Sequence, residues 1–215
     1  GWGTSLLLYW RLHEIPGRSD KSGNLRSILP MLVRFFLPLT LITFLRMSLT
    51  VSLTTFLPIY MIQRGFDIKA AGYYLAVLEF AGVGGALLSG TISDRLGRKN
   101  MLIVAFGASS LATLLFLQAS GVWIVVLLLA VGFTALSTGP LFLALVQDQV
   151  PNNRAVGNGL YLAISFVIRS LAMVMVGAGG DMLGLEATYF WSAIVSLFAI
   201  PLLLTLPRGA EVSPS

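Results

Sequence analysis

The sequence predicts an all-α integral membrane protein with six transmembrane helices, and three observations support this fold class. Of the 215 residues, 56% are hydrophobic and only 11% are charged, whereas a soluble globular domain carries about 25% charged residues. The mean hydropathy is +0.87. Apolar runs recur that match the ~20 residues needed to cross a hydrocarbon core. Together these features argue against a cytosolic enzyme, a disordered protein and a nucleic-acid-binding protein, because so many apolar residues must face lipid.

Short polar breaks separate the apolar runs, and we expect each run to form one helix. Strands are excluded because no alternating pattern of ~10 residues recurs. Pro38, Pro58, Pro140 and Pro201 fall inside or near the ends of these helices. Membrane helices tolerate proline because neighbouring groups re-satisfy the freed backbone. In chain order, the expected helices span about residues 33–62, 70–92, 101–117, 122–146, 157–179 and 187–206.

The distribution of basic residues orients these helices. Alternate loops and ends hold ten of the 14 Lys and Arg residues, and the remaining loops hold two. Because cytoplasmic loops carry the excess of basic residues, we expect the N-terminal segment, the second and fourth loops and the C-terminus in the cytoplasm. The net charge of +5 then reflects topology rather than nucleic-acid binding. The ten are Arg11, Arg18, Lys21, Arg26, Arg34, Arg95, Arg98, Lys99, Arg154 and Arg208, and the two are Arg64 and Lys69.

The chain divides into four expected segments. Residues 1–10 are apolar and aromatic but lack the basic region and cleavage site of a signal peptide, so they resemble the tail of a preceding transmembrane helix. Residues 11–32 are polar and basic, as in a cytoplasmic linker. Residues 33–206 form the six-helix transmembrane domain, and residues 207–215 a short cytoplasmic tail. This organisation predicts the second half of a longer protein.

Several kinds of chemical site are disfavoured. The chain has no cysteine, which excludes a disulfide framework, a thiolate metal site and a catalytic thiol. The single histidine, His13, lies in a polar stretch, which argues against a histidine-based metal site or catalytic triad. Neither H-E-x-x-H nor G-x-S-x-G occurs. We therefore expect no enzyme activity, no metal and no bound cofactor.

A short pattern, G-x-x-x-D-x-x-G, occurs twice with an offset of 87 residues. The offset corresponds to three expected helices, so the two copies would lie on opposite membrane faces. The first copy is followed by basic residues and the second is not, which agrees with that placement. The spacing predicts two inverted three-helix repeats, as in many secondary transporters; a chance match is the alternative. The copies are Gly90, Asp94, Gly97 and Gly177, Asp181, Gly184.

The first copy also carries a family resemblance. Residues 90–99, GTISDRLGRK, resemble the signature loop G-x-x-x-D-R-x-G-R-K of the major facilitator superfamily at all six defined positions. Residues 151–159, PNNRAVGNG, resemble the second cytoplasmic loop of that family. Residues 56–60, FLPIY, which follow Arg46, are similar to the C-terminal half of fosmidomycin-resistance-type exporters, although this match is less specific. The resemblance extends from about Leu25 onward and implies the C-terminal six-helix half of a twelve-helix fold.

The resemblance also implies a role for the signature loop. In the family, this loop is a cytoplasmic latch that breaks when the two halves rock against each other. The alternative is a simple anchor in which the basic residues hold the loop in the cytoplasm, but an anchor needs neither the aspartate nor the glycines. The latch residues implied here are Gly90, Asp94, Arg95, Gly97, Arg98 and Lys99.

Arg46, Glu79 and Arg169 lie near the middle of expected helices. Each would be ~14–20 Å from its helix start, at 1.5 Å per residue. A charge at that depth costs ~2.5–3.5 kcal/mol or more, so we expect these side chains to face a polar interior. Polar residues at helical spacing accompany both arginines and place them on polar stripes. The stripes are Thr43, Arg46, Thr50 and Thr54 on the first helix and Asn158, Tyr161, Ser165 and Arg169 on the fifth.

We expect these stripes to line a substrate and proton pathway formed by Arg46, Glu79, Arg169, Thr50, Ser165 and Tyr161. The arginines would bind an anionic group, and Glu79 would carry a proton. The alternative is a buried Arg–Glu pair that only fixes helix packing.

The expected function is secondary active transport of a small molecule by alternating access. We expect proton-coupled export by a drug or metabolite antiporter of the plasma (inner) membrane, driven by the proton gradient. The expected partners are the substrate, the lipid bilayer and either a missing N-terminal six-helix half or a second copy, and no nucleic acid. Two alternatives stay open, namely a non-transporting membrane scaffold or assembly subunit, and a half-size transporter that works as a homodimer.

Overall fold

The computed structural model describes residues 25–151 and 154–205, with side chains from Phe35 onward. The chain divides into two units, residues 1–34 and 35–215. In the first unit, the described part is the helical segment 25–34. The expected segments 1–10 and 207–215, and residues 11–24 of the linker with His13, lie outside the described residues.

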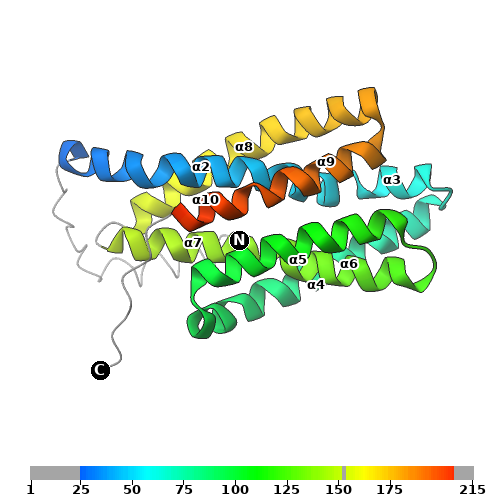
Figure 1. Cartoon of the computed structure of the whole chain (residues 1–215), viewed down its shortest axis with the longest axis horizontal. Helices are drawn as coiled ribbons and strands as arrows, with labels where there is room; N and C mark the ends of the chain where they lie inside the picture. The colour runs from blue at the N-terminus through cyan, green and yellow to red at the C-terminus, as the bar shows by residue number, and fades with distance from the viewer. Residues whose placement is uncertain (1–24, 152–153, 206–215) are drawn as a thin grey trace, which may run out of the picture. The chain divides into compact units, whose positions relative to one another are not determined.

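Six stretches of the described chain are long and apolar enough to cross a membrane, as the sequence predicts. No strand occurs within residues 25–151 and 154–205. Helix α2 begins at Leu25, where the sequence predicts a linker up to residue 32. The helices, shown in Figure 1, are α2 (Leu25–Thr55), α3 (Leu57–Gln63), α4 (Ile68–Leu96), α5 (Arg98–Gln118), α6 (Val122–Leu136), α7 (Thr138–Gln149), α8 (Arg154–Leu183), α9 (Leu185–Leu197) and α10 (Ala199–Thr205).

Three of the expected helices are interrupted by a single residue shortly before a proline. A proline ring clashes with the carbonyl group four residues earlier and has no N–H to donate to it. For Pro140 and Pro201 that carbonyl belongs to the residue at which α6 and α9 end, Leu136 and Leu197. The expectation of one continuous helix was therefore wrong at these places. The interruptions are Phe56 before Pro58, Ser137 before Pro140 and Phe198 before Pro201.

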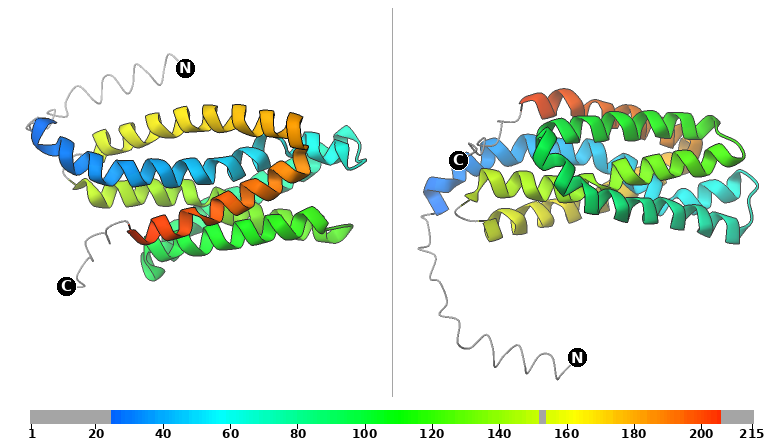
Figure 2. Two further views of the ribbon diagram at one scale, coloured as in Figure 1. Left: turned by 45° about the horizontal axis from the view of Figure 1, so that its top comes forward. Right: turned by 90° about the horizontal axis from the view of Figure 1, so that it is seen from below.

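The spans do not pack in chain order. Helix α6, in the fourth span, packs against α4 and α5, while α5 also packs against α9 and α7 against α8. Figure 2 shows these helices running roughly parallel or antiparallel to each other. The first span packs on the fifth, where Met47 and Val51 of α2 form a buried cluster with Ile168 of α8. The polar stripes of the first and fifth spans are therefore carried on neighbouring helices.

The contact between α4 and α6 requires glycine. A Cβ atom on Gly85 would lie 2.1 Å from the carbonyl oxygen of Phe133, and a Cβ atom on Gly132 would lie 2.1 Å from that of Leu78. Such distances are far below van der Waals contact, so only glycine lets the two backbones approach this closely.

Aromatic and hydroxyl side chains join the first span to the last. Tyr60 stacks on Tyr189 with ring centroids 4.9 Å apart, and the Tyr189 hydroxyl donates to the carbonyl of Ser52. Arg64 donates to the carbonyl of Ala119 at 2.6 Å and so caps the end of α5.

The turns after α4 and α8 have the same form. Gly97 and Gly184 each link two helices alone, and both have φ 83°, a conformation that favours glycine. These two glycines are the equivalent positions of the repeated pattern. The inverted repeat itself stays a prediction.

Candidate functional site

Arg46 is a buried cation in the middle of the first membrane-spanning helix. Its side chain is 5% exposed, and it lies ~16 Å from the start of the span at Phe35, at 1.5 Å per residue. Its Nη2 atom donates to the carbonyl oxygen of Ala135 at 3.2 Å. Its guanidinium also lies over the ring of Phe142, 5.6 Å from the centroid.

The other donors of Arg46 are not used. Among the described residues, Nε and Nη1 are buried and have no hydrogen-bond partner, and neither have Ser165 Oγ and Asn158 Oδ1 on α8. A buried donor without a partner costs ~1–3 kcal/mol, and more when it is charged. Arg46 therefore keeps two buried donors that no described residue uses.

Tyr161 and Arg169 complete this cluster from α8. Both side chains lie close enough to the guanidinium of Arg46 to interact with it electrostatically. Tyr161 is 4% exposed and stacks on Phe142 with centroids 5.9 Å apart, and Ser165 lies beside its phenol. Arg169 itself is exposed. Thr50 is buried, with its hydroxyl donating to the carbonyl of Arg46 at 3.4 Å.

Five of the six predicted pathway residues thus lie on the two facing helices α2 and α8, and the sixth, Glu79, does not join them. Glu79 lies on α4 with an exposed side chain. Within the described chain, both ion pairs involve Arg98. Arg46 and Glu79 therefore do not form the buried pair that was the alternative interpretation.

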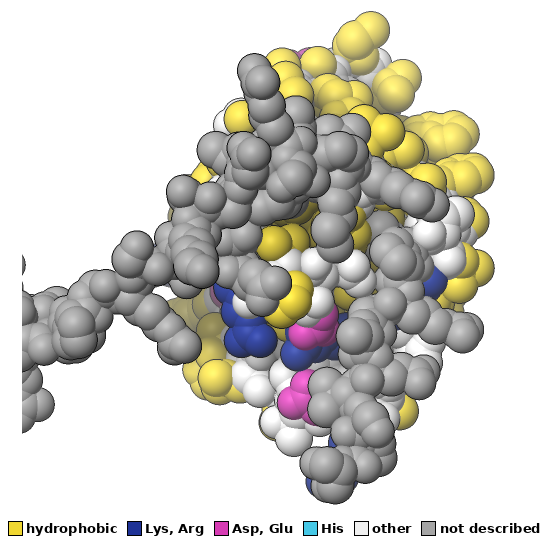
Figure 3. Space-filling model, turned by 90° about the vertical axis from the view of Figure 1, so that its left-hand side faces the viewer, with side chains coloured by type: hydrophobic (Ala, Val, Ile, Leu, Met, Phe, Trp, Pro, Cys, Tyr) yellow, Lys and Arg dark blue, Asp and Glu magenta, His cyan; other side chains and the backbone are white. Residues whose placement is uncertain are grey.

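The signature loop braces one end of the helical bundle. Arg98, at the start of α5, lies 2.5 Å from Asp148 of α7 and 4.0 Å from Asp94, and it also donates to the carbonyl of Ala144. Lys99 donates to the carbonyl of Leu204 at 2.7 Å. Figure 3 shows cationic and acidic side chains gathered at this end of the molecule.

The remaining signature residues have different surroundings. Arg95 and Gly90 are exposed, and a Cβ atom on Gly90 would meet nothing within 4 Å. Gly97 forms the turn with positive φ. Within the loop, Arg98 is therefore bound to this helical bundle, whereas Arg95 is exposed.

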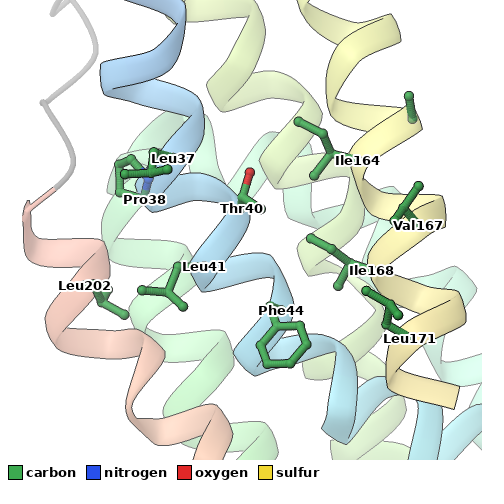
Figure 4. A pocket seen from close by; sticks show the side chains of 11 residues that line it. Leu37, Pro38, Thr40, Leu41, Phe44, Ile164, Val167, Ile168, Leu171 and Leu202 are labelled. Atoms are coloured by element: carbon green, nitrogen blue, oxygen red, sulfur yellow. The ribbon is translucent and has the colours of Figure 1, made fainter. Parts of the chain in front are cut away.

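An apolar groove of about 890 Å³ lies between α2, α8 and α10 (Figure 4). It is lined by side chains such as Leu41, Phe44, Val167 and Leu202. The hydroxyl of its one polar side chain, Thr40, donates to the carbonyl of Phe36. None of the predicted pathway residues lines the groove, and it offers no donors for an anionic substrate.

Three partners in these clusters were not predicted from the sequence. Phe142 and the carbonyl of Ala135 carry no sequence signal, because an aromatic residue and an alanine in an apolar run are expected in any membrane helix. Asp148 did carry one, since it is an acidic residue at the end of an apolar run on the basic side. Among the described residues, no group of three or more acidic or histidine side chains could hold a metal ion.

Comparison with known proteins gives a consistent result. The chain is 25% identical to the fosmidomycin resistance protein of Escherichia coli (strain K12), over 69% of this chain and 37% of that protein. It is 27% identical to the benzoate transport protein of Acinetobacter baylyi, over 75% and 34%, and 27% identical to the alpha-ketoglutarate permease of Bacillus subtilis, over 66% and 36%. The chain thus spans about a third of the length of these relatives. No solved structure matches it.

The model of the Major Facilitator Superfamily matches residues 3–173, well over half of the chain. The match contains the signature loop and agrees with the six helices able to span a membrane. The resemblance seen in the sequence is therefore confirmed, and the chain belongs to the Major Facilitator Superfamily, whose members are transporters rather than enzymes.

Proposed function

We propose that the chain is the C-terminal half of a secondary transporter that moves a small carboxylate across the plasma (inner) membrane by alternating access. The second half comes from further chain or from a second copy. The proposed mode is proton-coupled export, with the proton gradient as the energy source. The observation that carries the proposal is Arg46, whose buried guanidinium has two nitrogens without a partner among the described residues.

The charge balance around Arg46 favours an anionic substrate. Arg169 adds a second positive charge nearby, and neither arginine has an ion pair among the described residues. A carboxylate accepts strong charge-assisted hydrogen bonds from a guanidinium. The names of three relatives point the same way, because benzoate, galactarate or D-glucarate, and alpha-ketoglutarate are all carboxylates.

The proposal is tested by transport in proteoliposomes containing the full-length protein. Benzoate, D-glucarate and alpha-ketoglutarate serve as labelled substrates, with and without an imposed pH gradient. Arg46→Ala should lower transport of the accepted substrate at least 10-fold, since hydrogen bonds to a charged group contribute ~1.5–3 kcal/mol. Arg46→Lys should keep part of the activity because it keeps the charge.

Thr40→Val is the matched control. Thr40 is on the same helix, but its hydroxyl is already bonded to the carbonyl of Phe36 at 2.6 Å. This variant should transport at the wild-type rate. Wild-type kinetics in Arg46→Ala would contradict the role of Arg46, and transport that ignores the pH gradient would contradict proton coupling.

A further inference from the structure

The fourth span contains a joint where the helix is interrupted. Ser137 belongs to neither α6 nor α7, and Pro140 has no N–H with which to continue the helical ladder. Hydroxyl groups bond to backbone carbonyls around this joint, as Ser and Thr side chains do where a helix bends. They donate from Thr134 to Ala130 at 2.7 Å, from Ser137 to Thr134 at 2.9 Å and from Thr138 to Ala135 at 2.6 Å.

One of these carbonyls is shared with the candidate site. The oxygen of Ala135 accepts from Thr138 Oγ1 at 2.6 Å and from Arg46 Nη2 at 3.2 Å. A carbonyl oxygen has two lone pairs and can accept both bonds. Arg46, Thr138 and Ala135 are all buried. The cation that we assign to the substrate thus also holds the joint between α6 and α7.

We propose that the Ala135 carbonyl positions Arg46, and that through this carbonyl an anion bound to Arg46 changes the hydrogen bonding of the α6–α7 joint. This inference rests on the proposed function. A carboxylate carries a full negative charge and can bind a guanidinium through two parallel hydrogen bonds, which a neutral carbonyl cannot do, so a bound anion draws Nη2 away from Ala135. Thr138 then holds the joint alone, and α7 is freer to move relative to α6.

Helix α7 connects the α6–α7 joint to the signature loop. This helix carries Phe142, which lies under Arg46, and Asp148, which lies 2.5 Å from Arg98. A movement of α7 at the joint therefore changes the position of Asp148 relative to Arg98 of the loop. Occupancy of the site and the state of the loop would be linked through one helix.

The first test needs no substrate. Hydrogen–deuterium exchange of residues 134–142 is measured in the full-length protein in detergent. Arg46→Met removes the donor and keeps a side chain of similar length, and it should raise exchange at the joint several-fold. Thr134→Val is the control, because it removes the same kind of hydroxyl bond one turn earlier but leaves the Ala135 carbonyl intact. Unchanged exchange in Arg46→Met would overturn the inference.

The second test uses binding of benzoate, D-glucarate and alpha-ketoglutarate. Thr138→Val should weaken the Kd of the accepted anion about tenfold, because withdrawal of Arg46 then leaves the Ala135 carbonyl without a side-chain donor. Thr134→Val should leave the Kd unchanged. If Thr138 only stabilises the helix, its replacement will lower the Tm and not the affinity, and the inference is wrong.

The two proposals fail in different ways. If wild type binds an anion but exchange at residues 134–142 does not rise, the inference fails and the proposed function stands. If none of the three anions binds, the proposed function fails and the release step fails with it. The ligand-free comparison decides separately whether Arg46 holds the joint.

Discussion

Two arginines on the first and second helical segments show why residue type alone does not identify a site. Arg64 donates to the carbonyls of Ala119 and Phe116, at 2.6 and 3.4 Å, and lies over two aromatic rings. It caps a helix. Arg46 has one carbonyl acceptor at 3.2 Å and two nitrogens without partners among the described residues. The sequence predicts that Arg46 is functional from its depth and from the polar residues on the same helix face, and the geometry adds the unused donors.

Glu79 is the residue on which proton coupling is proposed to depend. Its side chain is exposed on α4 and has no ion pair among the described residues. We expect Glu79→Gln to abolish accumulation driven by a pH gradient while substrate exchange without a gradient continues, because only the proton carrier is lost. Gradient-driven uptake and counterflow in proteoliposomes measure the two activities.

Glu186→Gln is the control for this experiment. Glu186 is also an exposed carboxylate, but it lies in the first turn of α9 rather than near the middle of a span. Its replacement should affect neither activity. If Glu79→Gln keeps full gradient-driven accumulation, Glu79 is not the coupling group.

At the scale of helices, hydropathy predicts the existence of all six spans but not their interruptions. Phe56 and Phe198 are themselves apolar, and the few small and polar residues around Ser137 do not divide the fourth apolar run, so hydropathy marks no break. Prolines follow all three, yet Pro38 lies inside α2 without interrupting it. Whether a proline breaks a helix depends on how tertiary contacts satisfy the freed carbonyl, and the sequence does not contain those contacts in readable form.

The contact between α4 and α6 predicts unequal effects for two neighbouring glycines. Gly85→Ala places a Cβ atom 2.1 Å from a backbone oxygen of α6, whereas Gly84→Ala meets nothing within 4 Å. We expect Gly85→Ala to cost ~1–3 kcal/mol of stability, as overpacking does. Gly84→Ala should be neutral or slightly stabilising, because alanine favours the helix. Thermal unfolding in detergent compares them, and equal Tm values would contradict the close approach.

Replacing each arginine of the signature loop in turn should distinguish a stabilising contact within this helical bundle from a contact with the other half of the transporter. Arg98 is 28% exposed and bound to Asp148 and to a carbonyl of α7, so Arg98→Gln should cost ~1–2 kcal/mol of stability. Arg95 is exposed and has no ion pair among the described residues. Arg95→Gln should therefore leave the Tm unchanged and slow transport if it latches to the other half. An equal loss of Tm in both variants would contradict this division.

At the scale of the whole molecule, the packing order ties together residues that lie far apart in the chain. The first span contacts the fourth through Arg46 and Ala135 and the sixth through Ser52 and Tyr189. The distribution of basic residues proposes which ends of these spans face the cytoplasm, and the direction of transport is defined relative to that orientation.

Helix α5 offers a direct test of that orientation. It runs from Arg98 to Gln118, and 21 residues at 1.5 Å each give ~31 Å, enough to cross the ~30 Å core. The chain has no cysteine, so single cysteines can be placed at its two ends: Asn100→Cys lies in the first turn of α5 and Ser120→Cys lies just after the helix, both at exposed positions. In intact cells, a membrane-impermeant maleimide should label only Ser120→Cys, and it should label Asn100→Cys after the cells are opened. The reverse pattern would show that the basic loops face outward, and labelling of both sites from outside would show that α5 does not cross the membrane.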